Sequence, residues 1–176
     1  MKHLFYIFIM TITLGCSGQT KKESSTTPIV VNDSIMSAHG YDVVELQKME
    51  TGHLTATFNI NGKPCVFLVD TGGGGTLIDL SKKDKYELKA IAKRNYAAGI
   101  GSASSLVKTS AIFQINGKEI KSDKLFLMDI SYLNTELKKT KGRPVDGVLG
   151  TDFLEQHKAV IDYPHSKLYL IIEPDK

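Results

Sequence analysis

The segment FLVDTGGGGTLIDL, residues 67–80, contains the residues of this chain that could most directly do chemistry. An apolar run ends at Asp70, and Thr71 leads into four consecutive glycines. Glycine lets a backbone approach a carboxylate closely, and successive backbone N–H groups can stabilise its negative charge. A carboxylate held in this way can remove a proton from water, as a general base does. The sequence therefore predicts a reactive aspartate at the mouth of a glycine-rich loop.

Other reactive residue types form no comparable pattern. Cys65 lies in an apolar strand pattern, which is typical of a small buried side chain. The histidines are dispersed, without metal-ligand spacing and without a neighbouring serine or cysteine motif, so we interpret them as surface or turn residues. No metal, nucleotide or organic cofactor is indicated. These histidines are His39, His53, His157 and His165.

The elements that would position Asp70 are indicated by repeated strand and turn patterns. LTATFNI alternates, an Asn-Gly pair follows, and KPCVFLVD continues, which is a strong hairpin signal. FNINGK at 58–63 recurs as FQINGK at 113–118, and the approach FLVDTGGGG has a possible counterpart in RPVDGVLGTD. Two ordered repeats predict an all-β domain built from two similar halves.

The remaining patterns of the domain are mostly extended. Two strand-like segments flank Gly99 and Gly101, which fit the tip of a long hairpin. Helix is scarce, but TDFLEQH is typical of a helix start, with Asp152 as cap and Glu155 three residues on. HKAVIDYPHSKLYLII then predicts a final hairpin with a turn at Pro164.

The N-terminal residues indicate targeting rather than fold. MKHLFYIFIMTITLGC has a basic start and an apolar stretch that is short for a bilayer span, as in a secretory signal. Its end resembles a bacterial lipoprotein signal, in which the cysteine, here Cys16, receives lipid. We expect a signal over 1–16, a flexible tether over 17–41 and export to a membrane-tethered position in the cell envelope. An ordinary cleaved signal or an uncleaved anchor is the alternative.

Length and charge limit the function classes. The chain has 176 residues, enough for one domain, which we place at 42–174. The net charge is only +3. Lysine clusters near 82–85 and 138–143 are interpreted as solvated surface, the second in a loop, so no nucleic-acid partner is predicted.

Several motifs together resemble the retropepsin-like aspartic proteases. LVDTGGGGTLI is similar to their active-site loop, and GIGS at 99–102 is similar to the tip of their flap. VDGVLGTDFLEQHKAVIDY resembles the second half of their domain, in which two hydrophobic residues and a glycine, here Gly150, precede a short helix. The resemblance covers about 42–173 in the family's order. It implies an all-β, closed acid-protease single lobe with one short C-terminal helix.

The resemblance also implies a mechanism and site residues. Two carboxylates about 3 Å apart can share one proton, so that one acts as base and the other as acid in amide hydrolysis. Because the chain has one Asp-Thr-Gly, the resemblance implies a homodimer that pairs Asp70 from each subunit. Thr71 would bond across to the partner loop, and Gly72 would donate a backbone N–H. Peptide substrate would contact Gly73, Gly74, Gly99, Ile100, Gly101 and Ser102.

Alternatives remain for the second carboxylate and for the function. Within one chain, Asp146 and Asp152 are the rival carboxylates, although we interpret them as a turn residue and a helix cap. Gly73 and Gly74 stand where the family usually carries Ala or Ser and then Ser or Thr, so the hydroxyl that supports the outer aspartate oxygen is missing. A non-catalytic domain of this fold that binds extended peptides by strand addition is therefore the alternative.

The glycine run also resembles the phosphate loop of sugar-kinase and chaperone-type ATPases. In those proteins, glycine N–H groups surround phosphates and the aspartate organises Mg²⁺. Their folds require two lobes with long helices between the strands, for which this chain is too short. The phosphate-loop interpretation is therefore disfavoured.

Overall fold

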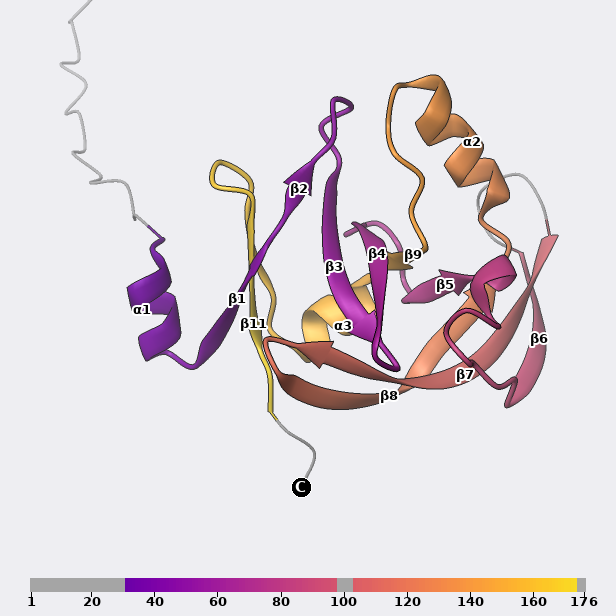
Figure 1. Ribbon diagram of the computed structural model, residues 1–176, viewed down its shortest axis with the longest axis horizontal. Helices are drawn as coiled ribbons and strands as arrows, with labels where there is room; N and C mark the ends of the chain where they lie inside the picture. Colours follow the sequence, from indigo (N-terminus) through magenta and orange to yellow (C-terminus); the bar gives the residue numbers. More distant parts are fainter. Residues whose placement is uncertain (1–30, 98–102, 174–176) are drawn as a thin grey trace, which may run out of the picture. The chain divides into compact units, whose positions relative to one another are not determined.

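Alternating apolar and polar residues give most of the domain an extended conformation. The computed structural model (Figure 1) describes residues 31–97 and 103–173, which lie in one compact unit beginning at Val31. In chain order the elements are α1 (Asp33–Ala38), β1 (Tyr41–Glu45), β2 (Gln47–Lys48), β3 (Leu54–Ile60), β4 (Lys63–Val69), β5 (Leu77–Asp79), the 3-10 turn η1 (Leu80–Lys82), β6 (Ala92–Ala97), β7 (Ala103–Ile115), β8 (Lys118–Met128), α2 (Ser131–Lys139), β9 (Gly147–Leu149), α3 (Thr151–Gln156), β10 (Val160–Asp162) and β11 (Lys167–Ile171).

The two Asn-Gly pairs form the two predicted hairpins. Asn61 and Gly62 have φ of 49° and 80°, and Asn116 and Gly117 have φ of 51° and 78°. Two consecutive positive φ values are what a tight turn between right-twisted strands requires, and Asn-Gly adopts them with little strain. The pairs therefore set the antiparallel registers of β3 with β4 and of β7 with β8.

The strands close into a barrel. The order β3-β4-β9-β5-β8-β7 is continuous, and β3 also pairs with β7 through Asn59↔Gln114 and Ile60↔Phe113, which closes a ring of six strands. β2 and β6 extend this sheet at its two ends. The predicted all-β, closed single lobe is confirmed. The predicted hairpin around residues 99–101 is confirmed on the strands that flank it, since β6 pairs with β7 as far as Ala97↔Ala103.

The two halves of the barrel correspond differently from the sequence prediction. β4 runs parallel to β9, and β8 runs parallel to β5, so β4 and β8 occupy equivalent places. β4 ends at Val69, so that Asp70 completes FLVD directly after it, and β8 ends at Met128, so that Asp129 completes FLMD in the same way. The counterpart of the Asp70 approach is therefore FLMD, and the predicted counterpart RPVD is wrong because it leads instead into β9.

The apolar side chains on the inward face of the barrel strands fill the barrel. Four phenylalanines lie at its centre, with ring centroids 5.2–6.3 Å apart. Burying each such side chain contributes roughly 1.5–3 kcal/mol. Phe153 belongs to α3, so this helix is held to the end of the barrel by the main core. The four rings belong to Phe58, Phe67, Phe113 and Phe153.

The opposite face of the same strands packs under α2, a helix that the sequence analysis did not predict. Leu133 and Leu137, four residues apart, lie on the same side of α2 and face this second core. The Asn134 side chain accepts from Val145 N (2.8 Å) and donates to Val145 O (3.0 Å), which fixes the helix to the segment before β9. The expected loop at 138–143 is therefore wrong for its first two lysines, which end α2. The second core comprises Met49, Leu68, Ile130, Leu137, Val145 and Val148.

β1, β10 and β11 form a three-stranded sheet ordered β1-β11-β10, which confirms the predicted final hairpin. α1 lies within the stretch expected to be a tether. Asn32 caps it by accepting from Ile35 N at 2.8 Å, and Asp33 accepts hydrogen bonds from Lys167 and Tyr169 of β11. Among the described residues, no helix is long and apolar enough to cross a membrane.

His157 is buried, contrary to the sequence expectation of a surface or turn position. It follows α3, and its ring lies 4.4 Å from that of Phe153, which brings it into the core. Nδ1 lies 3.0 Å from the Ile171 carbonyl oxygen, which accepts its hydrogen, and Nε2 has no partner among the described residues. Burial lowers the pKa of His157 below 6.5, because the charged ring would lose its hydration.

The domain should consequently lose stability as the pH falls. Below a pH of about 6.5 the unfolded state takes up a proton that the folded state binds more weakly, so the free energy of unfolding declines until the lower folded-state pKa is reached. His157→Gln removes this titration. Urea unfolding at about pH 7 and about pH 5.5 should show a larger decline for the natural chain than for the variant. Equal declines would contradict the assignment.

Candidate active site

Asp70 extends strand β4 by one residue. Its N–H donates to the Leu149 carbonyl at 3.1 Å, which continues the parallel β4–β9 ladder. Side chains alternate between the faces of a strand, so the side chain at position 70 leaves on the face of Val66 and Leu68. That is the face on which α2 packs. Asp70 itself is partly exposed.

The backbone of its own loop holds the Asp70 carboxylate. The Gly72 N–H donates to Oδ1 at 2.8 Å, and the Gly73 N–H lies 3.3 Å from the Asp70 carbonyl oxygen. A Cβ at position 73 would lie 3.0 Å from Oδ2, closer than side chains normally approach. The absence of a side chain at position 73 therefore leaves room for the carboxylate.

The start of α3 holds the glycine loop in place through hydrogen bonds and a close backbone contact, which together we call the clamp. The Gly73 carbonyl accepts from the Thr151 N–H at 2.7 Å and from its Oγ1 at 3.1 Å. A Cβ at position 150 would lie only 2.5 Å from the Gly75 carbonyl carbon. The two backbones can approach this closely only because Gly150 has no side chain.

A hydrogen bond between the buried Thr76 and the partly buried Asp152 completes the clamp. Thr76 is 3% exposed, donates from Oγ1 to Asp152 Oδ1 at 2.7 Å, and accepts from Gly150 N at 3.1 Å. The same Asp152 oxygen accepts from the Phe153 N–H at 2.7 Å. Gly150, not Asp152, is the N-cap of α3, and no side chain caps it. The predicted helix cap is therefore wrong, because Asp152 is the second residue of α3, two positions after the N-cap, and its side chain accepts from Thr76.

Asp146 lies in a bend directly before β9, near the predicted turn, and its side chain also links distant segments. Its Oδ2 accepts from the Val66 N–H at 3.2 Å and lies 3.4 Å from Lys85 Nζ. Lys82 Nζ lies 3.9 Å from Oδ1. Asp146 thus ties β4 to the segment after β5, and neither rival carboxylate is hydrogen-bonded to Asp70.

The other predicted site residues divide into two groups. Thr71 and Gly74 are exposed, and a Cβ at position 74 would contact nothing within 4 Å. The flap-tip residues 99–102 and Cys16 lie outside the described residues. Within residues 31–97 and 103–173, no three His, Cys, Asp or Glu side chains are grouped as metal ligands.

Sequence reasoning missed two features of the site. Asp129, the counterpart of Asp70, accepts from the Ser131 N–H at 2.8 Å just as Asp70 accepts from Gly72. The repeated letters FLVD and FLMD could have located it. The contact of Asp152 with Thr76 joins residues 76 positions apart, and no local pattern signals it.

A family model described as aspartyl protease matches residues 56–153, more than half of the chain. The chain belongs to the aspartyl protease family. The matched range runs from β3 to α3, so this aspartyl protease domain contains the Asp70 loop and its clamp. No curated protein matches the chain significantly.

Solved structures of retropepsin type are similar to this member of the aspartyl protease family. A retropepsin-like aspartic protease from Rickettsia conorii is 20% identical, with 74% of this chain and 90% of that one covered and a TM-score of 0.49. The retroviral protease-like domain of Ddi1 from Leishmania major is 17% identical, with coverages of 70% and 89% and a TM-score of 0.48. EIAV protease, complexed with the inhibitor HBY-793, is 22% identical, with coverages of 58% and 85% and a TM-score of 0.42.

The Thr76–Asp152 hydrogen bond should contribute measurably to stability. Thr76→Val leaves a partly buried carboxylate oxygen without this donor, which should cost about 1–3 kcal/mol. Combined with Asp152→Ala, it should show a coupling energy of about 1 kcal/mol or more in urea unfolding. Thr109→Val is the control, because Thr109 is also buried but donates to Lys89 O instead. Equal coupling of Asp152 to both threonines would contradict a specific clamp.

Proposed function

We propose that this protein is an aspartic endopeptidase that hydrolyses extended peptides. The observation that carries the proposal is the Asp70 carboxylate, held by the Gly72 N–H in a loop that α3 clamps from outside. Fixed backbone groups orient a catalytic carboxylate without reorganisation during the reaction. Membership of the aspartyl protease family supports the same chemistry.

In the proposed reaction, two Asp70 carboxylates share one proton across a water molecule. The ionised carboxylate takes a proton from the water as the water oxygen bonds to the amide carbon. The protonated carboxylate donates its proton to the carbonyl oxygen. The tetrahedral intermediate then collapses. The C–N bond breaks as the leaving nitrogen receives a proton, which yields a carboxylic acid and an amine.

The second Asp70 would come from a second copy of the chain. The rival carboxylates Asp146 and Asp152 are both engaged in structural contacts. Thr71, beside Asp70, is exposed and can reach a partner loop. A two-fold axis through the site would bring both carboxylates together.

One observation favours a second candidate, a peptide-binding domain without catalysis. Among the described residues, only Oδ1 of Asp70 has a hydrogen-bond donor, and Gly73 supplies no hydroxyl to Oδ2. Such a domain would still bind extended chains beside the Asp70 loop by strand addition. Binding without hydrolysis would therefore identify it.

Cleavage by the full-length chain in mild detergent should depend on Asp70 and on protein concentration. Asp70→Asn, which is nearly isosteric, should lower peptide cleavage by about 10²–10⁴-fold or more, because the pair can no longer share a proton. The specific rate should rise steeply with enzyme concentration as dimers form. Products from a diverse peptide pool would be read by mass spectrometry from acid to neutral pH.

Three outcomes would separate the candidates. Loss of cleavage in Asp70→Asn, with a steep concentration dependence, supports the paired-Asp70 peptidase. Peptide binding by both forms without cleavage supports the binding domain. Cleavage by a strict monomer, shown by sedimentation, would exclude the shared pair.

We also propose, from the N-terminal sequence, that the protein is exported and anchored by lipid on Cys16. Each methylene group of a lipid chain that enters the membrane contributes about 0.8 kcal/mol to membrane binding. The natural chain, expressed in bacteria with labelled fatty acid, should therefore carry label and stay with membranes. Cys16→Ser should lose both, whereas unlabelled natural protein would exclude the anchor.

A further inference from the structure

The segment 138–143, KKTKGR, carries four cations and no acid. Some lysines elsewhere in the described chain have carboxylate partners: Lys63 Nζ lies 2.7 Å from Glu87, and Lys118 Nζ lies 2.7 Å from Asp42. Of the four cations in 138–143, only Lys139 forms an ion pair in the described part of the chain, with Glu136 of its own helix. The segment therefore presents unneutralised positive charge to solvent.

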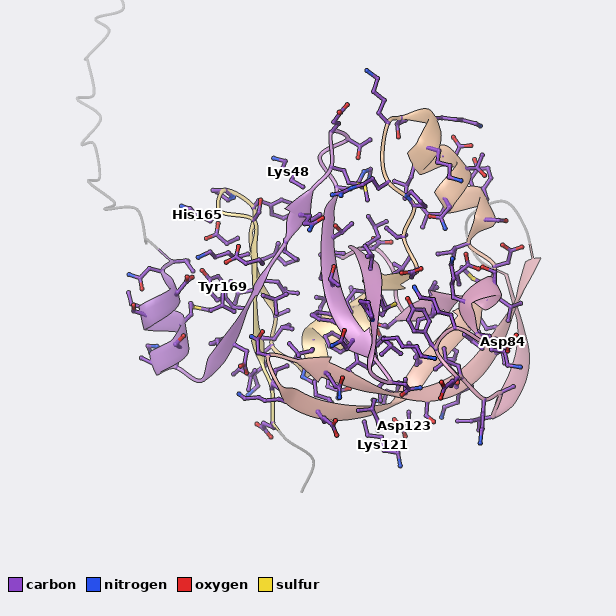
Figure 2. The ribbon with its side chains drawn as sticks, viewed as in Figure 1. Lys48, Asp84, Lys121, Asp123, His165 and Tyr169 are labelled. Carbon is purple, nitrogen blue, oxygen red and sulfur yellow. The ribbon has the colours of Figure 1, made fainter. Side chains whose placement is uncertain are left out.

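Contacts with a neighbouring strand fix the position of this segment. Arg143 Nη2 donates to Gln47 Oε1 at 2.8 Å, which joins this segment to β2. A Cβ on Gly142 would lie 3.3 Å from the Met49 sulfur, so the segment also packs against the residue after β2. Lys48 stands between Gln47 and Met49 in sequence, and Figure 2 shows its side chain on the side of β2 away from α2. We call the exposed side chains of Lys138, Lys139, Lys141 and Arg143 the basic surface.

Helix stability explains only part of the basic surface. Lys138 and Lys139 stand in the last turn of α2, where cations interact favourably with the helix dipole. Lys141 lies beyond the helix with φ of 60°, a left-handed conformation that glycine adopts with less strain. A lysine thus occupies a position where local stability would favour glycine.

The basic surface and Asp70 belong to elements that meet on one face of the sheet. β9 begins four residues after Arg143, and its Leu149 carbonyl accepts the Asp70 N–H. α2, which carries two of the lysines, covers the same face of β4 that Asp70 extends. A peptide bound at the Asp70 loop that extends along this face toward the end of α2 would therefore meet the basic surface.

We propose that the basic surface binds an acidic segment of the peptide substrate, so that the protease selects chains with Asp or Glu residues flanking the scissile bond. This inference rests on the proposed peptidase function and names its substrate class. Like charges gathered on one surface attract an oppositely charged partner, accelerate its association and lose this effect as salt screens them.

Binding can be tested without cleavage in the full-length Asp70→Asn chain, held in mild detergent. The probes are two fluorescent peptides of equal length, one with alternating Glu and Ser and one with alternating Gln and Ser. The acidic peptide should bind about tenfold or more tightly at low salt, and the difference should shrink toward zero as salt rises to about 1 M. Equal binding of the two peptides at low salt would overturn the proposal.

Two variants with the same charge change separate the basic surface from net charge. Lys138→Gln, Lys141→Gln and Arg143→Gln together should abolish the preference for the acidic peptide. Lys89→Gln, Lys124→Gln and Lys158→Gln remove three exposed lysines elsewhere and should leave most of the preference. Equal losses in the two triple variants would overturn the proposal.

Lys141→Gly distinguishes recognition from a merely structural role. Glycine relieves the left-handed strain, so the midpoint of thermal unfolding should rise, while binding of the acidic peptide should weaken severalfold. In the chain that keeps Asp70, the same change should raise KM for an acidic substrate and leave kcat unchanged. Unchanged peptide binding with a raised midpoint would overturn the proposal.

Two further results have separate meanings. Binding to phosphatidylglycerol vesicles that depends on the 138–143 cations, without any peptide preference, would overturn the proposal in favour of a lipid surface. A preference for acidic peptide in Asp70→Asn, with no cleavage by the chain that keeps Asp70, would support the basic surface as a peptide site. It would refute the peptidase function alone.

Discussion

The close backbone contact between the start of α3 and the glycine loop is the constraint on which the site depends. Gly150 approaches Gly75 to a distance that no Cβ would permit, and Thr151 holds the Gly73 carbonyl. Phe153, three residues after Gly150, anchors the same helix in the barrel core. The loop that orients Asp70 is therefore fixed by main-core packing, which explains how so many glycines can be ordered despite their entropic cost.

The approximate two-fold repeat of the barrel gives two equivalent loops different uses. In each half an Asn-Gly hairpin leads to a strand whose end, with the next residue, reads Phe-Leu-x-Asp. The loop after Asp70 is short and held by backbone contacts, whereas the loop after Asp129 contains α2 and covers an apolar sheet face. One architecture thus supplies an exposed carboxylate and, on the same face of the sheet, a helix that ends in a cluster of positive charge.

Much of the fold and the Asp70 loop could be predicted from the sequence because these features depend on local chemistry. Asn-Gly selects a tight turn, alternation selects strands, and glycines beside Asp70 select a close backbone approach, so the hairpins, the all-β class and the Asp70 loop could all be predicted. The burial of His157 and the partner of Asp152 could not. Each depends on which distant element packs against it, and a side chain of either type is common on surfaces as well.

By itself, the sequence determined the strands, their turns and the residue that could do chemistry, because these follow from preferences within a few neighbouring residues. Only the tertiary structure decided that β4 pairs with β9, that Thr76 contacts Asp152, and that α2 forms over the second apolar face. Those outcomes require the burial of apolar faces from segments far apart in the chain. No local pattern specifies which of several compatible faces will meet.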